Sequence, residues 1–303
     1  MSPWVVHRVD HRREEPGTFV TVNDDELITL DLAAAELGVH YMTAYRRVRS
    51  GRLRATQDGR TWWIRRGDLR GHHHPAVSSP LGSTEAFTTA LFDGDETAAW
   101  DCISRQLHAP GGTSIERASD LLLDVIAASL RQVGDQWARG ETSVAAEHRA
   151  SALALRLIAR IGAEARPPGR RSRLVLIGAP LHDIYTLPAA IFGELLRLRG
   201  CEVIEIGSDL RPEDLAEATS SSHEPQVLCL SCTQVGNETA IRSAIAAIRR
   251  RSPQVLIAAG GLAVPTEAIA LALGADLGGS DTVAVANRIA GRSRHDRGTN
   301  SSE

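Results

Sequence analysis

The sequence predicts a multidomain protein: a small helix-turn-helix head, then a helical bundle, then an α/β domain. Three observations lead to this expectation. Arginines cluster between residues 41 and 70, helical periodicity continues from 85 to 166, and short apolar runs alternate with amphipathic helices from 171 to 292. A chain of 303 residues is long enough to form two or three units of this size.

Composition narrows the class of protein further. All 34 basic residues are arginine, and the formal net charge is −3. No apolar run approaches the ~20 residues that span a bilayer, and the N-terminus lacks the apolar centre of a secretory signal, so we expect a cytoplasmic protein. Four irregularly spaced cysteines are too few for a disulfide framework.

Residues 26–70 carry the signals of a winged helix-turn-helix. Thr29 is a suitable N-cap for a first helix that Gly38 ends, and a second helix is predicted from about residue 40 to 50. The Asp58-Gly59 pair favours a hairpin turn between two short strands, which would form the wing. Nine arginines between residues 41 and 70 are opposed only by Asp58 and Asp68, which indicates a polyanionic partner.

This stretch, from ELITLDLAAAELG to TWWIRRGDL, resembles the winged helix-turn-helix of the MerR and excisionase type. The resemblance implies that the second helix enters the major groove of double-stranded DNA and that the wing reaches the backbone. One copy has little area for specific binding, so a homo-oligomer, either a dimer or a tetramer, is expected. A basic module for protein interaction is the alternative. The DNA-binding candidates are His40, Tyr41, Thr43, Arg46, Arg47, Arg60 and Trp62.

A linker is predicted at residues 71–84, and four helices over residues 85–166 are expected to form a bundle. Trp137 stands at the end of the third helix, and Glu147 and His148 open the fourth. A large ring and two titratable groups therefore meet where two helices join. By itself this arrangement is also typical of a structural corner.

Residues 171–292 alternate strand and helix five times, which favours a parallel, flavodoxin-like (Rossmann-like) sheet of order 2-1-3-4-5. His182 follows the first strand, Ser231 and Thr233 follow the third, and Gly260-Gly261 follows the fourth. The carboxyl ends of parallel strands share one edge, so these residues are expected to line one crevice. The first loop is not the glycine-rich turn of dinucleotide-binding proteins. A neutral imidazole there can instead ligate a metal centre carried by a large cofactor.

From about Glu85 to Ala290 the sequence looks like the cobalamin-binding module of methionine synthases and of light-dependent MerR-type repressors that use adenosylcobalamin. The resemblance implies that His182 ligates cobalt, and that the Trp, Glu and His of the helical cap cover the adenosyl group. Pro180 stands where the family has an acid, for which Asp183 is a candidate replacement, and Tyr185 stands where it has glycine and could crowd the cofactor's nucleotide tail. The implied cofactor-binding residues are Trp137, Glu147, His148, His182, Ser231, Thr233, Gly260 and Gly261.

Together these features predict a DNA-binding transcriptional regulator, with repression as the expected sign, that senses cobalamin and acts as a photoreceptor through adenosylcobalamin. No enzyme turnover is required. Two alternatives stay open: a regulator with a degenerate, cofactor-free domain used for oligomerisation or partner binding, and a corrinoid carrier for methyl transfer. Cys229 and Cys232 form a CxxC pair without a second pair, which we interpret as buried small side chains.

Overall fold

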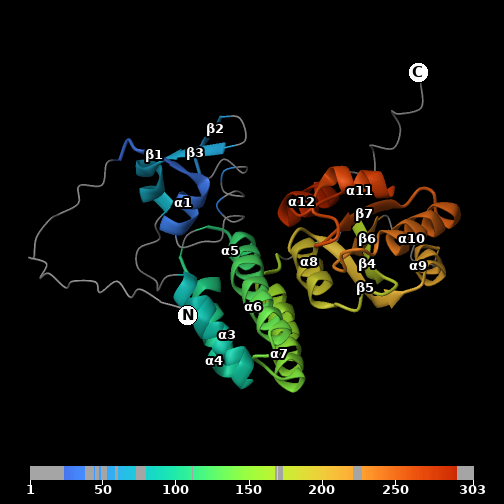
Figure 1. Cartoon of the computed structure of the whole chain (residues 1–303), viewed down its shortest axis with the longest axis horizontal. Helices are drawn as coiled ribbons and strands as arrows, with labels where there is room; N and C mark the ends of the chain where they lie inside the picture. The colour runs from blue at the N-terminus through green and yellow to red at the C-terminus, as the bar shows by residue number, and fades with distance from the viewer. Residues whose placement is uncertain are drawn as a thin grey trace, which may run out of the picture.

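The computed structural model describes residues 24–37, 44, 48, 53–58, 61–72, 80–110, 112–167, 169, 173–220 and 227–291. They form an N-terminal module, a helical bundle and a sheet domain (Figure 1). Among the helices of these residues, none has the length and apolar composition needed to cross a membrane.

The N-terminal module combines a three-stranded antiparallel sheet with a helix. Strands β1 (Leu27–Thr29), β2 (Thr56–Asp58) and β3 (Thr61–Arg65) pair in the order β1-β3-β2, and α1 spans Leu30–Glu36. Asp58 pairs with Thr61, so two residues separate the strands, as the predicted hairpin requires. The Thr29 hydroxyl accepts the Leu32 N–H at 3.4 Å, which confirms the predicted cap.

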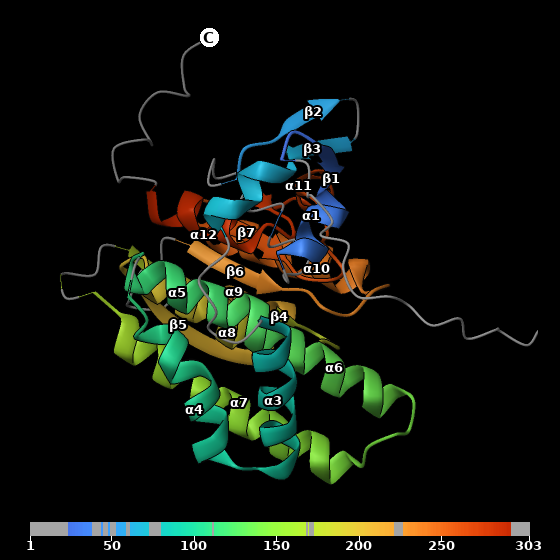
Figure 2. The same cartoon turned by 90° about the vertical axis from the view of Figure 1, so that its left-hand side faces the viewer.

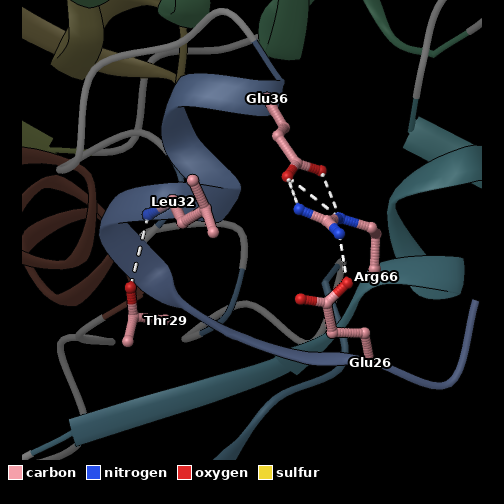
Figure 3. A network of polar contacts seen from close by, with 5 residues as sticks. All are labelled: Glu26, Thr29, Leu32, Glu36 and Arg66. Atoms are coloured by element: carbon pink, nitrogen blue, oxygen red, sulfur yellow. Dashed lines mark hydrogen bonds and ion pairs between the residues drawn. The ribbon is translucent and has the colours of Figure 1, made fainter. Parts of the chain in front are cut away.

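Arg66 holds this module together rather than facing a partner (Figure 3). It opens a 3₁₀ helix, η1 (Arg66–His72), and its guanidinium donates to Glu36 at the end of α1 and to Glu26 before β1. The hydrogen bond with Glu36 raises the pKa of this guanidinium. One of the nine clustered arginines is therefore neutralised inside the module.

The four predicted helices of the bundle are present, and the third contains a π-helical segment, η2 (Leu121–Ile126). Pro80 begins the first helix, as proline favours the first turn, so the predicted linker 71–84 is shorter at both ends. The helices are α3 (Pro80–Asp93), α4 (Glu96–Leu107), α5 (Ser114–Asp120), α6 (Ala127–Ala138) and α7 (Val144–Ala165).

The sheet domain has five parallel strands in the order β5-β4-β6-β7-β8, which confirms the predicted topology. One face of the sheet packs in the same core as α8 and α12, and the other packs against α9, α10 and α11 (Figures 1 and 2). The strands are β4 (Arg173–Pro180), β5 (Cys201–Leu210), β6 (Val227–Ser231), β7 (Leu256–Gly260) and β8 (Leu277–Gly278). The helices are α8 (Leu187–Arg197), α9 (Pro212–Thr219), α10 (Glu238–Arg251), α11 (Glu267–Leu273) and α12 (Thr282–Gly291).

The bundle and the sheet domain share one hydrophobic core. Ile158, Ile161 and Ala165 of α7 belong to the same buried cluster as Leu195 of α8 and Ile177 of β4. Because this core is continuous, α7 and α8 couple the orientation of the bundle to that of the sheet.

Candidate functional site

His182 stands on a strained turn at the carboxyl end of β4. Its φ of 70° lies in the left-handed region, where a residue other than glycine is uncommon. The Asp209 carboxylate accepts the His182 N–H at 2.7 Å, and the Asp209 N–H donates to the Asp183 carbonyl at 2.9 Å. The imidazole is exposed. The positive φ of His182 is thus stabilised by the end of the neighbouring strand β5, and the ring is exposed at the sheet edge.

Asp183, the next residue, is fully buried and joins two loops that are 50 residues apart. Its carboxylate accepts from the Thr233 hydroxyl at 2.5 Å, from the Thr233 N–H, and from the Gln234 N–H at 3.1 Å. Through these three hydrogen bonds the Asp183 carboxylate binds the loop that follows β6. Asp183 therefore fixes the position of the His182 loop through backbone and hydroxyl groups of the loop after β6. In the related family an acid at the position of Pro180 is expected to orient the imidazole, and Asp183 does not contact the imidazole in this way.

We expect Asp183→Ala to destabilise the protein by about 1–3 kcal/mol, because it leaves part-buried donors on Thr233 and Gln234 without their acceptor. Urea unfolding measures the change, and Asp101→Ala, on an exposed face of α4, is the matched control. Amide exchange at residues 233 and 234 should also accelerate in the Asp183 variant. Unchanged exchange at these amides would contradict the hydrogen bonds assigned between Asp183 and the loop after β6.

The glycine pair after β7 leaves no room for side chains. Gly261 has a φ of 117°, and a Cβ there would lie 2.3 Å from the Cys232 carbonyl oxygen. A Cβ on Gly260 would lie 3.2 Å from the Gly279 carbonyl oxygen. Glycine is therefore required at Gly261 and favoured at Gly260 because the protein's own backbone packs closely there, and both glycines line a cavity at this edge.

A cavity of about 120 Å³ leads from this edge into the space between the sheet and helices α8 and α12. Tyr185 does not line it, and its side chain is 48% exposed. The lining residues are Ile177, Pro188, Ala189, Phe192, Cys229, Leu230, Ser231, Ala258, Gly260, Gly261, Gly279, Thr282 and Val285.

The bundle presents its three candidate residues at the α6–α7 turn. His148 Nδ1 lies 2.6 Å from one carboxylate oxygen of Glu147. The other oxygen of this carboxylate accepts a hydrogen bond from the Ser151 hydroxyl at 2.6 Å. Trp137 is 46% exposed. Figure 2 shows the carboxyl end of α6 directed toward the same side as the arrowhead of β6. The structure thus pairs Glu147 with His148 and leaves the indole accessible, with no described contact from these groups to His182.

Most DNA-binding candidates lie outside the described residues: His40, Tyr41, Thr43, Arg46, Arg47 and Arg60. Trp62 is described and packs against the core of the N-terminal module. Trp63 points to the opposite face of β3, where it lines a groove with Arg54 and Arg65. Period-two alternation around the buried Ile64 was the signal that could have identified Trp63.

The two cysteines of the CxxC pair are buried, as expected. Burial raises the pKa of both thiols, so they stay protonated at neutral pH. Within the described part of the chain, no group of three or more His, Cys, Asp or Glu side chains is placed to hold a metal ion.

Two family models match the chain: a B12 binding domain at residues 84–161 and another B12 binding domain at residues 173–287. A comparison with curated proteins gives no match. Among solved structures, the monomethylamine corrinoid protein of Methanosarcina barkeri is 14% identical with a TM-score of 0.54, and the match covers 69% of this chain and 97% of that chain. At this identity the likeness concerns the fold.

Two further solved structures are similar at a lower TM-score. The methanol:cobalamin methyltransferase complex of Methanosarcina barkeri is 17% identical over 75% of this chain and 84% of that chain, with a TM-score of 0.36. A cobalamin-binding protein from Desulfitobacterium hafniense is 17% identical over 68% of this chain and 96% of that chain, with a TM-score of 0.39.

The residues at the sheet edge fit a corrinoid. His182 offers an exposed imidazole after β4, and Gly260 and Gly261 line the cavity at the ends of β6 and β7. When bound, a corrinoid would supply a cobalt centre that the His182 imidazole could ligate. The chain is a cobalamin-binding protein whose two-part B12-binding module spans residues 84–161 and 173–287.

Proposed function

We propose that this protein is a transcriptional regulator, with repression as its expected sign, that binds double-stranded DNA through its N-terminal module and senses adenosylcobalamin through the rest of the chain. The observation that carries the proposal is the arginine-bearing sheet and helix at residues 24–72, which lie wholly outside the B12-binding module. A protein that only carried a corrinoid would have no need of such a module.

The outer face of β3 supports contact with a nucleic acid backbone. Trp63, Arg54 and Arg65 line a polar groove there, and Arg54 is exposed. Arg65 pairs with Asp25 at 3.0 Å, but both side chains are largely exposed, at 58% and 82%. Such exposed pairs contribute about 0–1 kcal/mol, so exchanging Asp25 for a phosphate costs little.

Sensing follows from linkage between the cofactor and the assembly. Trp137, Glu147 and His148 on the bundle would cover the adenosyl group of a cofactor held by His182, so the cofactor would bridge the two parts of the module. A cofactor that binds one homo-oligomer more tightly than another favours that oligomer, and DNA affinity then follows the number of joined N-terminal modules. Light that cleaves the cobalt–carbon bond would remove the bridge, and no step requires turnover.

DNA binding by the cobalamin-loaded protein is expected to be salt-dependent and to weaken in Arg54→Ala. Removing one phosphate contact lowers the slope of log K against log salt by about 0.9. Fluorescence anisotropy with DNA from the upstream region of this protein's own gene, in the dark and after green illumination, measures both effects. The matched control is Arg156→Ala, which removes a similarly exposed arginine from α7.

An unchanged slope in Arg54→Ala would remove Arg54 from the interface. Absence of any DNA binding with and without cobalamin, in the dark and in light, would refute the regulator.

A second candidate is a corrinoid carrier for methyl transfer, favoured by the fold shared with the monomethylamine corrinoid protein. It predicts that the bound corrinoid, once reduced, accepts a methyl group from a partner methyltransferase and that DNA has no effect on the protein. The cofactor-free alternative receives no support, because both parts of the B12-binding module are matched.

A further inference from the structure

Helix α7 carries Glu147 and His148 at one end and contacts the sheet domain at the other. The turn that precedes α7 lies far from α8 (Figure 2), whereas Gly162, near the end of α7, lies against Glu194 of α8. At a rise of about 1.5 Å per residue, His148 stands about 21 Å from Gly162 along the helix. A tilt of α7 by about 10° at Gly162 therefore displaces His148 by about 4 Å.

The two helices approach each other closely because α7 has no side chain at the contact. The Glu194 carboxylate occupies the space that a Cβ on Gly162 would need, and both residues are buried. Glycine within a helix is less stable than alanine, but here it is the residue that leaves room for Glu194. The Glu194 side chain therefore sets how near α7 lies to α8 at this point.

The Glu194 carboxylate is held by arginines on both sides of the contact. One oxygen accepts from Arg166 Nη2 at 3.1 Å, and the other accepts from Arg197 Nη1 at 2.8 Å. Arg166 directly follows α7, whereas Arg197 belongs to α8 and also donates to Glu205 of β5 at 2.9 Å. Charge-assisted hydrogen bonds are strong and directional, so these bonds fix the Glu194 side chain between the two helices.

The apolar contacts around Glu194 hold the two helices together but do not by themselves fix the angle between them. Ile158, Ile161 and Ala165 of α7 share a buried cluster with Leu195 of α8. Burial of apolar area is non-directional, so it does not favour one tilt of α7 strongly over another. The directional element at this contact is the Glu194 carboxylate with its two arginines.

We propose that Glu194 is a positioning residue that sets the tilt of α7 and thereby the selectivity of the protein for the upper ligand of the corrinoid. Trp137, Glu147 and His148 would meet an adenosyl group from the side of the bundle. His182 would ligate cobalt from the sheet domain, whatever the upper ligand is. Hydrogen bonds need distances of about 2.7–3.2 Å, so a displacement of α7 by several ångströms removes those that it makes to the upper ligand. The inference rests on the proposed sensing of adenosylcobalamin and is independent of DNA binding.

The test compares adenosylcobalamin with methylcobalamin, which differ only in the upper ligand. Equilibrium dialysis of the full chain in the dark gives both dissociation constants without depending on any activity. We expect the wild-type chain to bind adenosylcobalamin more tightly than methylcobalamin, by about 10-fold or more. Because His182 would serve both corrinoids alike, the ratio of the two constants reports on the contribution of the bundle.

Two substitutions disturb the contact from opposite sides. Glu194→Gln keeps the shape of the side chain but removes the charge that holds Arg166 and Arg197, and Gly162→Ala forces the Glu194 side chain to move. Each should reduce the preference for adenosylcobalamin by about 3-fold or more, while the dissociation constant of methylcobalamin changes by less than about 2-fold. Glu205→Gln is the matched control, because Glu205 lies on β5 and binds the same Arg197, and it should keep the wild-type preference. Far-UV circular dichroism checks that each variant is folded.

An undiminished preference for adenosylcobalamin in both Glu194→Gln and Gly162→Ala would overturn this inference alone. Equal weakening of both corrinoids would overturn it as well, because Glu194 would then act on folding rather than on recognition of the upper ligand. Equal affinities of the wild-type chain for the two corrinoids would refute the sensing of the adenosyl group, and this inference with it. Failure of the proposed function and failure of the positioning role are therefore distinct results.

Discussion

Replacing His182 with glycine is expected to weaken cobalamin binding by at least about 10-fold while leaving the protein as stable as before or more so. The loss would follow from removal of the proposed cobalt ligand, since loss of even an outer-shell partner of a metal ligand typically costs about 10–100-fold. Stability should not fall, because His182 has a φ of 70° and glycine adopts that conformation without steric cost. Dialysis and urea unfolding of the same samples separate the two effects.

The electron paramagnetic resonance spectrum of the protein with bound cob(II)alamin would show whether the nitrogen that ligates cobalt belongs to His182. An axial nitrogen splits each cobalt line, and protein labelled with ¹⁵N-histidine changes that pattern only if the nitrogen belongs to the protein. We expect the change in labelled wild-type protein and its absence in His182→Gly. The control is His108→Ala, which removes an exposed imidazole from the bundle. A pattern insensitive to the label would show that the cofactor's own base ligates cobalt instead.

Much of this site could be predicted from the sequence, because it depends on features that are local. Short apolar runs alternating with helices predict a parallel sheet, and the sheet order places the loops after β4, β6 and β7 on one edge. Ser231 and Gly260, which lie opposite each other at the ends of β6 and β7, can therefore be placed at the edge where His182 follows β4. The twofold periodicity of a strand likewise places Trp62 and Trp63 on opposite faces, once the buried Ile64 fixes the register.

The remaining features depend on distances between loops, and no sequence period encodes these. Asp183 is tied to Thr233 and Gln234 across 50 residues, and Asp209 reaches back to His182 across 27. The resemblance to the cobalamin-binding module implied that Tyr185 could crowd the nucleotide tail, and sequence alone did not show that its side chain is 48% exposed.

The junction between α7 and α8 is a second feature that the sequence does not reveal. Glu194 is 5% exposed, and its carboxylate accepts from Arg166 at 3.1 Å and from Arg197 at 2.8 Å. Arg197 also donates to Glu205 at 2.9 Å. Because Arg166 directly follows α7, whereas Glu194 and Arg197 belong to α8, this ion network connects the bundle to the sheet domain.

Glu194→Ala is expected to destabilise the protein by about 3–5 kcal/mol, because it leaves two part-buried guanidinium groups without their shared partner. Urea unfolding measures the change. Glu205→Ala is the matched control, since Glu205 binds the same Arg197 but is 37% exposed, and we expect it to cost no more than about 1 kcal/mol. Equal losses of unfolding free energy in the two variants would mean that the burial of Glu194 does not determine how much it contributes to stability.

Gly162 of α7 provides the sharpest test of this junction, because the Glu194 side chain occupies the space that a side chain at position 162 would need. A Cβ on Gly162 would lie 1.8 Å from a Glu194 carboxylate oxygen, so Gly162→Ala should destabilise the wild-type protein. In the Glu194→Ala background the clash is gone, and the same change should stabilise the helix by about 1 kcal/mol, the difference in helix propensity between glycine and alanine. Gly134→Ala, in α6 with no atom within 4 Å of the added Cβ, should stabilise both backgrounds equally. A double-mutant cycle in which Gly162→Ala has the same effect in both backgrounds would show that Glu194 yields freely and that the junction is not rigidly packed.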